Sequence, residues 1–231
     1  MTPSTIDGLK REAAQAAVKK LADGMVIGLG SGTTSEIAID EIGKRVKQGL
    51  RIIGVPTSER VAGLAQYVGI PLSTLAKHPR LDVTIDGADE VEIGTLHLIK
   101  GGGGNLLREK IVAASSERFV IVADDRKLVT RLGTHWKVPV EVAPFGWQAT
   151  AERLRQTGAE PVLRSGENGD AYVTDGGHYI LDCQYGPIHD PVGLKTRLDG
   201  TVGVMEHGLF LGMANEAIIA GGDGVKVYRL A

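Results

Sequence analysis

The chain has 231 residues, of which 42% are hydrophobic and 23% are charged, and its formal net charge at pH 7 is -2. This charge argues against nucleic acid or an anionic membrane as a partner, because both usually require a basic surface. No apolar run reaches the roughly 18 residues of a membrane span, and no secretion signal is recognisable. The single cysteine, Cys183, excludes an intrachain disulfide and fits a reducing compartment. We therefore expect a cytoplasmic protein.

The first 132 residues predict short apolar strands that alternate with helices. Such alternation is typical of a parallel sheet covered by helices on both faces. Strands are expected at 25–29, 51–55, 81–86, 95–99 and 119–123, and helices at 4–22, 35–46, between a Ser58 cap and Gly69, and after Gly104.

The pattern changes after residue 132, where Pro and Trp residues cluster. Two helices are expected at 148–157 and 191–198, separated by a hairpin with strands at 171–174 and 179–183. Cys183 falls in the second of these strands, so we interpret it as a small buried hydrophobic residue.

The order of these elements predicts an α/β fold with two units. Residues 208–230 read as strand, turn and strand, and are expected to rejoin the first sheet. We predict a Rossmann-like parallel sheet flanked by helices, formed by 1–132 and 207–231. A smaller α+β domain of the ferredoxin-like type is expected to be inserted at 133–206.

Residues 28–34 (GLGSGTT) lie between a predicted strand and a predicted helix. Successive backbone N–H groups at such a turn favour an anion, and the helix dipole and the hydroxyl groups add to this. The spacing is not that of a dinucleotide site, the next strand ends without an acidic residue for a ribose, and no Walker triplet is present. We predict a monophosphate site; the alternative is a tight turn capped by Ser31 or Thr33.

Residues 81–110 contain the charged candidates for catalysis. Asp86 and Asp89 follow a predicted parallel strand, at the edge where open α/β sheets hold ligands. Carboxylates there bind sugar hydroxyls or a metal, but none of the six histidines has ligand spacing with them. Lys100 precedes four glycines and can stabilise an oxyanion. Glu109 lies in the first turns of the next helix, where the dipole tends to lower a carboxyl pKa.

Each of these features has a plain structural interpretation when taken alone. Glu109 fits an ordinary solvated helix residue, and the glycine run fits a flexible loop. A base that removes a proton from carbon needs a raised pKa, which an apolar pocket would have to provide. Together, a phosphate site, one lysine and three carboxylates, without a cofactor motif, suit proton transfer beside the carbonyl of a phosphorylated sugar.

The strings GLGSGTT, DGADE and KGGGGNLLREK, in this order and spacing, resemble the signature segments of type A ribose-5-phosphate isomerase. The resemblance covers essentially the whole chain, including 119–127 and 222–226. It implies an aldose–ketose isomerase that interconverts D-ribose 5-phosphate and D-ribulose 5-phosphate in the non-oxidative pentose phosphate pathway. It also implies that no metal or cofactor is needed and that the protein is a homodimer. The pair Gly104-Asn105 departs from the family pattern, because many relatives have small residues such as alanine there, and this leaves the start of the helix open.

The resemblance also assigns roles position by position. Glu109 matches the catalytic base, and Asp86, Asp89 and Lys100 match the polar residues around the reacting carbons. Lys127 matches a substrate-binding lysine, and Lys10 matches the phosphate-contacting lysine of the first helix. The implied substrate-binding set is Ser31, Gly32, Thr33, Thr34, Asp86, Gly87, Ala88, Asp89, Lys100, Gly101, Gly102, Gly103, Lys127 and Lys10.

Two alternatives use the same phosphate motif. A related enzyme, such as an amino-sugar-phosphate deaminase or a small-molecule transferase, is the first; the deaminase would add a histidine beside the acidic groups, and none is near DGADE or Glu109. A non-enzymatic sugar-phosphate sensor is the second. It would call for an attached helix-turn-helix, whereas the residues before Met25 predict one helix.

Overall fold

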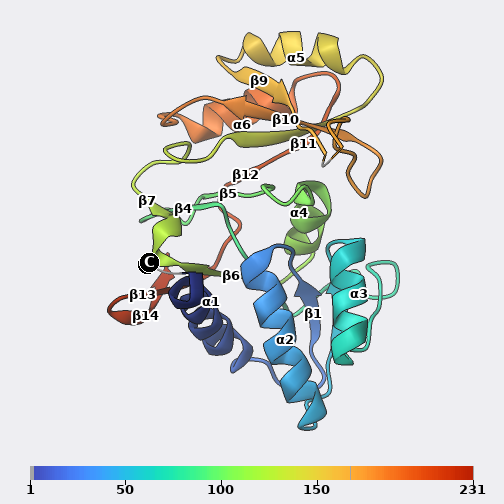
Figure 1. The fold of residues 1–231 in the computed structure, drawn as a ribbon, viewed down its shortest axis with the longest axis vertical. Helices are drawn as coiled ribbons and strands as arrows, with labels where there is room; N and C mark the ends of the chain where they lie inside the picture. Colours follow the sequence, from blue (N-terminus) through green and yellow to red (C-terminus); the bar gives the residue numbers. More distant parts are fainter. Residues whose placement is uncertain (1–2, 167, 231) are drawn as a thin grey trace.

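The computed structural model describes residues 3–166 and 168–230. Its largest sheet has the strand order β14-β13-β6-β3-β1-β2. Figure 1 labels β14, β13, β6 and β1 of this sheet. All neighbouring strands in it are parallel except β13 and β14, which are antiparallel. The strands are β1 (Val26–Leu29), β2 (Ile53–Pro56), β3 (Val83–Asp86), β6 (Phe119–Asp124), β13 (Glu216–Gly221) and β14 (Gly224–Arg229).

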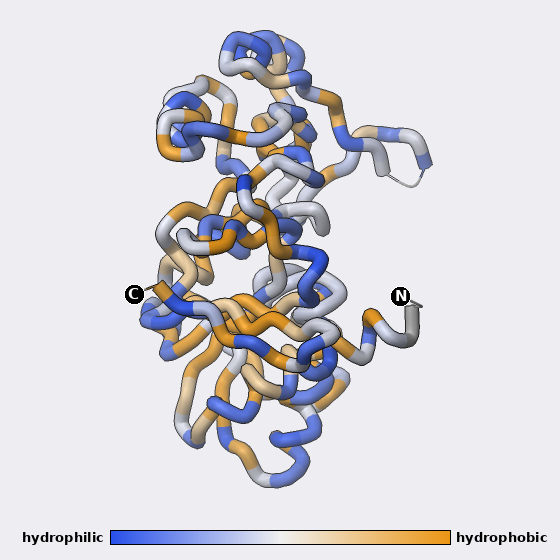
Figure 2. The backbone as a smooth tube through the Cα atoms, turned by 90° about the vertical axis from the view of Figure 1, so that its left-hand side faces the viewer, coloured by the Kyte–Doolittle hydropathy of each residue, from blue (hydrophilic) through white to orange (hydrophobic). Residues whose placement is uncertain are grey.

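Both faces of this sheet are buried, because successive side chains of a strand point to opposite sides. In β6, Val120 and Val122 pack in one apolar cluster, whereas Phe119 and Ile121 pack in another. Figure 2 shows hydrophobic residues concentrated in this central part of the molecule. The first cluster includes α1 (Pro3–Val18), α2 (Thr33–Lys47) and α3 (Glu59–Val68), and the second includes α4 (Leu106–Ala114).

Two smaller sheets lie on the α4 side of the main sheet (Figure 1). The first has the order β12-β5-β4-β7 and is built from very short strands. It places Lys100 directly after a buried strand and a short 3-10 helix beside it. Its elements are β4 (Glu90–Glu92), β5 (Leu98–Ile99), η1 (Asp125–Lys127), β7 (Leu128–Val129) and β12 (Leu209–Phe210).

The second smaller sheet is antiparallel and has the order β11-β8-β10-β9. Along the chain its elements run β-α-β-β-α-β, which is the ferredoxin-like arrangement. Cys183 is buried in β10, as expected. The elements are β8 (Val138–Val142), α5 (Trp147–Arg155), β9 (Glu160–Leu163), β10 (Tyr179–Gln184), α6 (Pro191–Asp199) and β11 (Val204–His207).

The expected hairpin with strands at 171–174 and 179–183 is wrong in its first half. Residues 171–174 make only isolated bridges, and β9 takes the place beside β10. Strand β9 was not predicted, because a proline such as Pro161 usually argues against a strand. Proline is tolerated there because β9 is an edge strand of its sheet.

Two other expected elements are shorter in the structure. The strand expected at 95–99 is reduced to Leu98–Ile99, because Gly94 and Leu96 have φ of 92° and 52° and turn the chain between β4 and β5. The first helix ends at Val18 rather than at residue 22. The cap at Ser58, which accepts from the Val61 N–H, and the stop at Gly69 are both confirmed.

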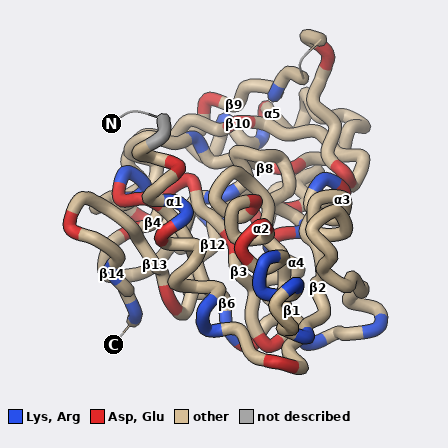
Figure 3. The backbone as a smooth tube through the Cα atoms, turned by 60° about the horizontal axis from the view of Figure 1, so that its bottom comes forward, with Lys and Arg blue, Asp and Glu red and all other residues tan. Residues whose placement is uncertain are grey.

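The sheets support the two units expected from the sequence, and we keep their limits, 1–132 with 207–231 and 133–206, as a proposal. Strands β13 and β14 lie in the main sheet beside β6, whereas β8 to β11 form a sheet of their own. Figure 3 shows basic and acidic residues interspersed around the molecule. Within the described residues, no helix has the length and apolar character to cross a bilayer.

Replacing Phe119 by alanine is expected to lower the free energy of unfolding by about 3–5 kcal/mol. Phe119 is 1% exposed, and its ring centroid lies 6.3 Å from that of Phe210 between the main sheet and the short-stranded sheet. Urea unfolding measures the loss. Phe145→Ala is the matched control, because Phe145 is 97% exposed and its replacement should change stability by less than about 0.5 kcal/mol. Equal effects of the two substitutions would contradict this assignment of the core.

Candidate active site

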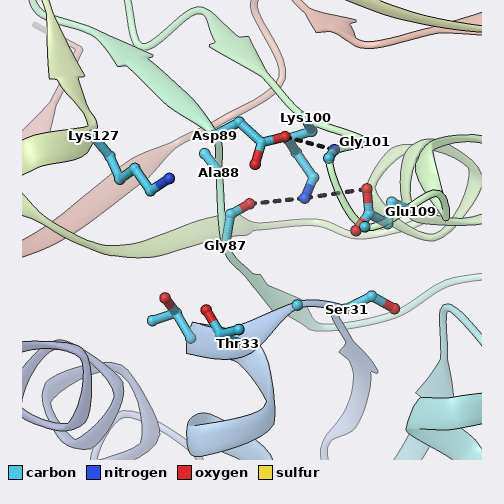
Figure 4. A pocket seen from close by; sticks show the side chains of 13 residues that line it. Ser31, Thr33, Gly87, Ala88, Asp89, Lys100, Gly101, Glu109 and Lys127 are labelled. Atoms are coloured by element: carbon cyan, nitrogen blue, oxygen red, sulfur yellow. Dashed lines mark hydrogen bonds and ion pairs between the residues drawn. The ribbon is translucent and has the colours of Figure 1, made fainter. Parts of the chain in front are cut away.

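One pocket brings together segments that are far apart in the sequence (Figure 4). It lies at the carboxyl ends of β1 and β3, the edge at which parallel sheets hold ligands. The predicted site residues all line it except Asp86 and Lys10, and each of these contacts a lining residue. The lining residues are Ser31, Gly32, Thr33, Thr34, Gly87, Ala88, Asp89, Lys100, Gly101, Gly102, Gly103, Glu109 and Lys127.

The ammonium group of Lys100 lies between two buried carboxylates. Its Nζ is 3.0 Å from Asp86 Oδ2 and 3.3 Å from Glu109 Oε2. It also donates a hydrogen bond to the Gly87 carbonyl at 2.8 Å. The three charged side chains are at most 5% exposed. Because water and salt scarcely screen charges at such depth, these contacts are strong.

The carboxylates of Glu109 and Asp86 are held in different ways. Glu109 Oε2 and Asp86 Oδ2 are buried, and neither has a hydrogen-bond partner among the described residues, so their contacts with Lys100 are ion pairs. Asp86 is fixed through Oδ1, which accepts from the Ser35 hydroxyl at 2.9 Å and from the Gly87 N–H at 2.7 Å. Glu109 has no such second anchor among the described residues, so its carboxyl group is the less constrained of the two.

The burial of this cluster changes the proton affinities of its members. Burial raises the pKa of Glu109 to about 8; Lys100 opposes the shift, and Asp86 and Asp89 reinforce it. Burial also raises the pKa of Asp86, again against Lys100. Burial alone would lower the pKa of Lys100, but the two carboxylates outweigh it and raise that pKa. At Glu109 the pocket therefore overrides the helix dipole, which the sequence indicated as a lowering influence.

The glycine run forms a hydrogen-bonded turn between β5 and α4. Gly101 and Gly104 have φ of 102° and 83°, a region that favours glycine, and the Gly104 N–H donates to the Gly101 carbonyl at 3.0 Å. The Gly102 N–H donates to Asp89 Oδ2 at 2.7 Å. A Cβ at Gly102 would lie 2.8 Å from the Asp89 carboxylate. Glycine is thus required for the backbone to approach Asp89.

The turn before α2 leaves backbone N–H groups at its helix N-terminus without a side-chain cap. The N-cap residue is Gly32, with φ of 102°, and it has no side-chain cap hydrogen bond. The alternative of a turn capped by Ser31 or Thr33 is therefore wrong. Instead, Thr33 Oγ1 accepts a hydrogen bond from Lys10 Nζ at 3.0 Å. Backbone donors, the helix dipole and a lysine converge here, as an anion site requires.

Ser31 contributes its backbone to the pocket rather than its hydroxyl. Its Oγ donates to Ser58 Oγ at 2.9 Å and lies 2.7 Å from Thr57 Oγ1, and Figure 4 shows it pointing away from Thr33. The hydroxyl thereby ties the turn to the start of α3. Of the predicted hydroxyl donors, those of Thr33 and Thr34 remain for a ligand.

Lys127 reaches into the pocket from the side opposite Glu109 (Figure 4). Its Nζ lies 4.7 Å from the ring centroid of Trp136, a distance at which a cation is attracted to an aromatic face. Trp136 and Ser35 were not predicted as site residues from the sequence. Ser35 directly follows the glycine-rich motif, and this position could have indicated that it belongs to the site. Trp136 lay in a region without a recognised motif.

The family described as "Ribose 5-phosphate isomerase A (phosphoriboisomerase A)" matches residues 53–224 of the chain. The chain is 56% identical to the ribose-5-phosphate isomerase A of Synechococcus sp. (strain JA-3-3Ab), over 98% of this chain and 99% of that protein. It belongs to the ribose-5-phosphate isomerase A family. The family member from Gloeobacter violaceus (strain ATCC 29082 / PCC 7421) is also 56% identical, over 96% of each chain.

Solved structures agree with this membership. The structure of ribose 5-phosphate isomerase A from Methanocaldococcus jannaschii is 39% identical with a TM-score of 0.92, covering 96% of this chain and 99% of that one. A D-ribose-5-phosphate isomerase in complex with phospho-erythronic acid is 39% identical with a TM-score of 0.93, covering 97% and 99%. The family resemblance and the α/β fold with a flanked sheet, both predicted from the sequence, are confirmed.

The geometry does not support the alternatives to a ribose-5-phosphate isomerase A. A deaminase was expected to place a histidine beside the acidic groups, yet no histidine lines this pocket within the described residues. In the same part of the chain, no group of three or more His, Cys, Asp or Glu residues is arranged to hold a metal ion.

The start of the helix after the glycine run, which the pair Gly104-Asn105 left open, is at Leu106. Asn105 is the N-cap residue of α4 and makes no side-chain cap hydrogen bond.

Glu109→Gln is expected to remove a pH dependence of stability. The pKa of Glu109 is raised from 4.5 to about 8, so between these values the folded state holds a proton that the unfolded state releases. This contribution is complete below the unfolded pKa and is lost as the pH rises through the folded pKa. Urea unfolding at about pH 5 and about pH 9 should therefore show a smaller decline for Glu109→Gln than for the parent protein. Glu117→Gln, at an exposed position after the same helix, should retain the parent decline. An unchanged decline in Glu109→Gln would contradict the raised pKa.

Proposed function

We propose that this protein interconverts D-ribose 5-phosphate and D-ribulose 5-phosphate, as an aldose–ketose isomerase of the non-oxidative pentose phosphate pathway. The carrying observation is the buried cluster in which Lys100 lies 3.0 Å from Asp86 and 3.3 Å from Glu109, in the same pocket as an uncapped helix N-terminus. The pocket thus offers a proton acceptor and an oxyanion stabiliser at one end and an anion site at the other. Those are the two needs of a phosphorylated sugar undergoing proton transfer.

The phosphate of the substrate binds at the N-terminus of α2. Backbone N–H groups of residues 32–34 and the hydroxyls of Thr33 and Thr34 donate to its oxygens, while the helix dipole favours the negative charge. Lys10, hydrogen-bonded to Thr33, adds a positive charge from behind, and Lys127 adds a second from across the pocket. This end fixes the substrate without taking part in the chemistry.

Glu109 acts as the base at the other end. It takes the proton from C2 of the open-chain aldose and returns it to C1, so a single carboxylate serves both carbons from one face of the intermediate enediolate. Lys100 stabilises the negative charge that develops on the substrate oxygen. A base whose pKa of about 8 lies near the working pH combines a substantial ionised fraction with a strong tendency to accept the proton.

Asp89 and Asp86 have different tasks. Asp89 lines the pocket and reaches the substrate hydroxyls, so it moves the hydroxyl protons and assists ring opening. Asp86 is 0% exposed and does not line the pocket. It acts through Lys100, because its charge keeps that ammonium protonated and in place.

A relative's ligand supports this reading. One similar structure holds phospho-erythronic acid, a phosphorylated sugar acid. Its carboxylate spreads a negative charge over two oxygens, as an enediolate does at C1 and C2. The family resemblance further supports a homodimer and a cytoplasmic location, which we include in the proposal.

The purified protein, treated with a chelator, is expected to convert ribose 5-phosphate to the ketose, and Glu109→Gln should lower kcat by at least about 100-fold. Glutamine keeps the shape of the side chain but removes its basicity, so KM should change much less. The conversion is followed by the appearance of ketose. Glu117→Gln serves as the control with normal kcat. Near-normal turnover by Glu109→Gln would transfer the base role to Asp89, and an inactive parent protein would refute the proposed function.

Replacing Thr33 and Thr34 together by valine should raise KM for ribose 5-phosphate by at least about 100-fold, because the two lost hydrogen bonds to a charged group each contribute about 1.5–3 kcal/mol. The change should appear equally in the inhibition constant of inorganic phosphate, with kcat reduced far less. Thr130→Val, at an exposed threonine outside the pocket, is the matched control. If the double variant binds phosphate as the parent does, the phosphate site lies elsewhere.

A further inference from the structure

Arg164 connects the sheet of β8 to β11 to the glycine turn of the pocket. It follows β9 directly, and its backbone is held on both sides, with its N–H donating to Ile180 at 2.9 Å and its carbonyl accepting from Tyr172 at 2.8 Å. Its side chain is 15% exposed and extends from that sheet towards the glycine turn. The Nη1 group donates to the carbonyls of Gly101 and Gly102 at 2.9 and 3.1 Å.

Asp182 fixes the orientation of this guanidinium. Arg164 Nε donates to Asp182 Oδ2 at 3.0 Å, and Nη2 donates to Asp182 Oδ1 at 2.5 Å. A two-point contact of this kind holds the guanidinium plane in one direction. The ring of Tyr172 lies 5.9 Å from the same group. With Nε and Nη2 engaged by Asp182, Nη1 is left for the glycine carbonyls, a division of donors that lysine cannot reproduce.

The two glycine carbonyls determine where the N–H groups of the turn point, because the C=O and N–H of a trans peptide group face opposite ways. Arg164 holds the Gly101 carbonyl, so the N–H of the same peptide, that of Gly102, faces away from the guanidinium and donates to Asp89 at 2.7 Å. Arg164 also holds the Gly102 carbonyl, so the Gly103 N–H faces away as well, on a residue that lines the pocket. A cation on a carbonyl oxygen polarises the peptide and strengthens its N–H as a donor.

We propose that Arg164 is a positioning residue of the isomerase: through these two peptide groups it sets the place of the Asp89 carboxylate and presents the Gly103 N–H to a substrate oxygen. This inference rests on the proposed function. It gives the β8–β11 unit a part in catalysis, although its side chains supply none of the acid, base or phosphate-binding groups.

Arg164→Met is expected to lower kcat about 10- to 100-fold, because displacing a catalytic group by about 1 Å has an effect of this size. KM for ribose 5-phosphate should change less than about threefold, since the phosphate-binding turn of α2 and Lys127 are untouched. Arg155→Met is the matched control, because Arg155 is half-exposed on α5 of the same unit and pairs with Glu152; its kcat should be unchanged. An unchanged kcat in Arg164→Met would overturn the proposal.

Two further measurements separate positioning from general damage. Methylguanidinium added to Arg164→Ala should restore part of kcat in a saturable way, whereas methylammonium should not. Arg164→Met should also lower kcat less in an Asp89→Asn background than in the parent, because the carboxylate it places is already lost. No rescue together with equal losses in both backgrounds would overturn the proposal.

Should Arg164→Met fail to fold, Asp182→Asn is the substitute variant, because it loosens the guanidinium and should lower kcat in the same way. An inactive parent protein refutes the proposed function, whereas equal activity of parent and Arg164→Met refutes the positioning role alone.

Discussion

The site depends on one ammonium group shared by two almost fully buried carboxylates. Burying an ion is unfavourable by several kcal/mol, and a single cation does not neutralise two anions. With both carboxyl groups ionised, the cluster of Lys100, Asp86 and Glu109 therefore holds a surplus of negative charge, which a proton on Glu109 relieves. Burial, reinforced by the charges of Asp86 and Asp89, gives this carboxyl its affinity for a proton near neutral pH.

The distance between the two ends of the pocket is set by regular elements rather than by flexible loops. Asp86 ends β3 and accepts from Ser35, which lies in the first turn of α2, at 2.9 Å. This hydrogen bond joins the helix that presents its N-terminus to the strand that carries the buried acid. Functional groups held by a strand and a helix keep a precise spacing. A substrate anchored by its phosphate thus meets the proton-transfer groups at a fixed separation.

The sequence predicted the features whose signals are local, and missed those that arise from contacts between distant segments. The alternation of strands and helices and the glycine-rich turns lie within short windows, so they were visible. That burial outweighs the helix dipole at Glu109 depends on neighbours from β3 and β5, which a window does not contain. Strand β9 was hidden by Pro161, which only an edge position permits. Arg164 was hidden because its carbonyl partner Gly101 is 63 positions away along the chain.

The position of β13 between β6 and β14 has a consequence for biosynthesis. Residues 120–124 pair in parallel with residues 216–220, and all of β8 to β11 is translated between them. While the chain emerges from the ribosome, the β8–β11 unit has its full set of strands before β6 can receive its neighbour. Until β13 is translated, one edge of β6 in the main sheet has no partner strand. Apolar surface and an unpaired strand edge then remain exposed, which favours aggregation. Late translation thus leaves the edge of β6 open to pairing with other chains until β13 has been made.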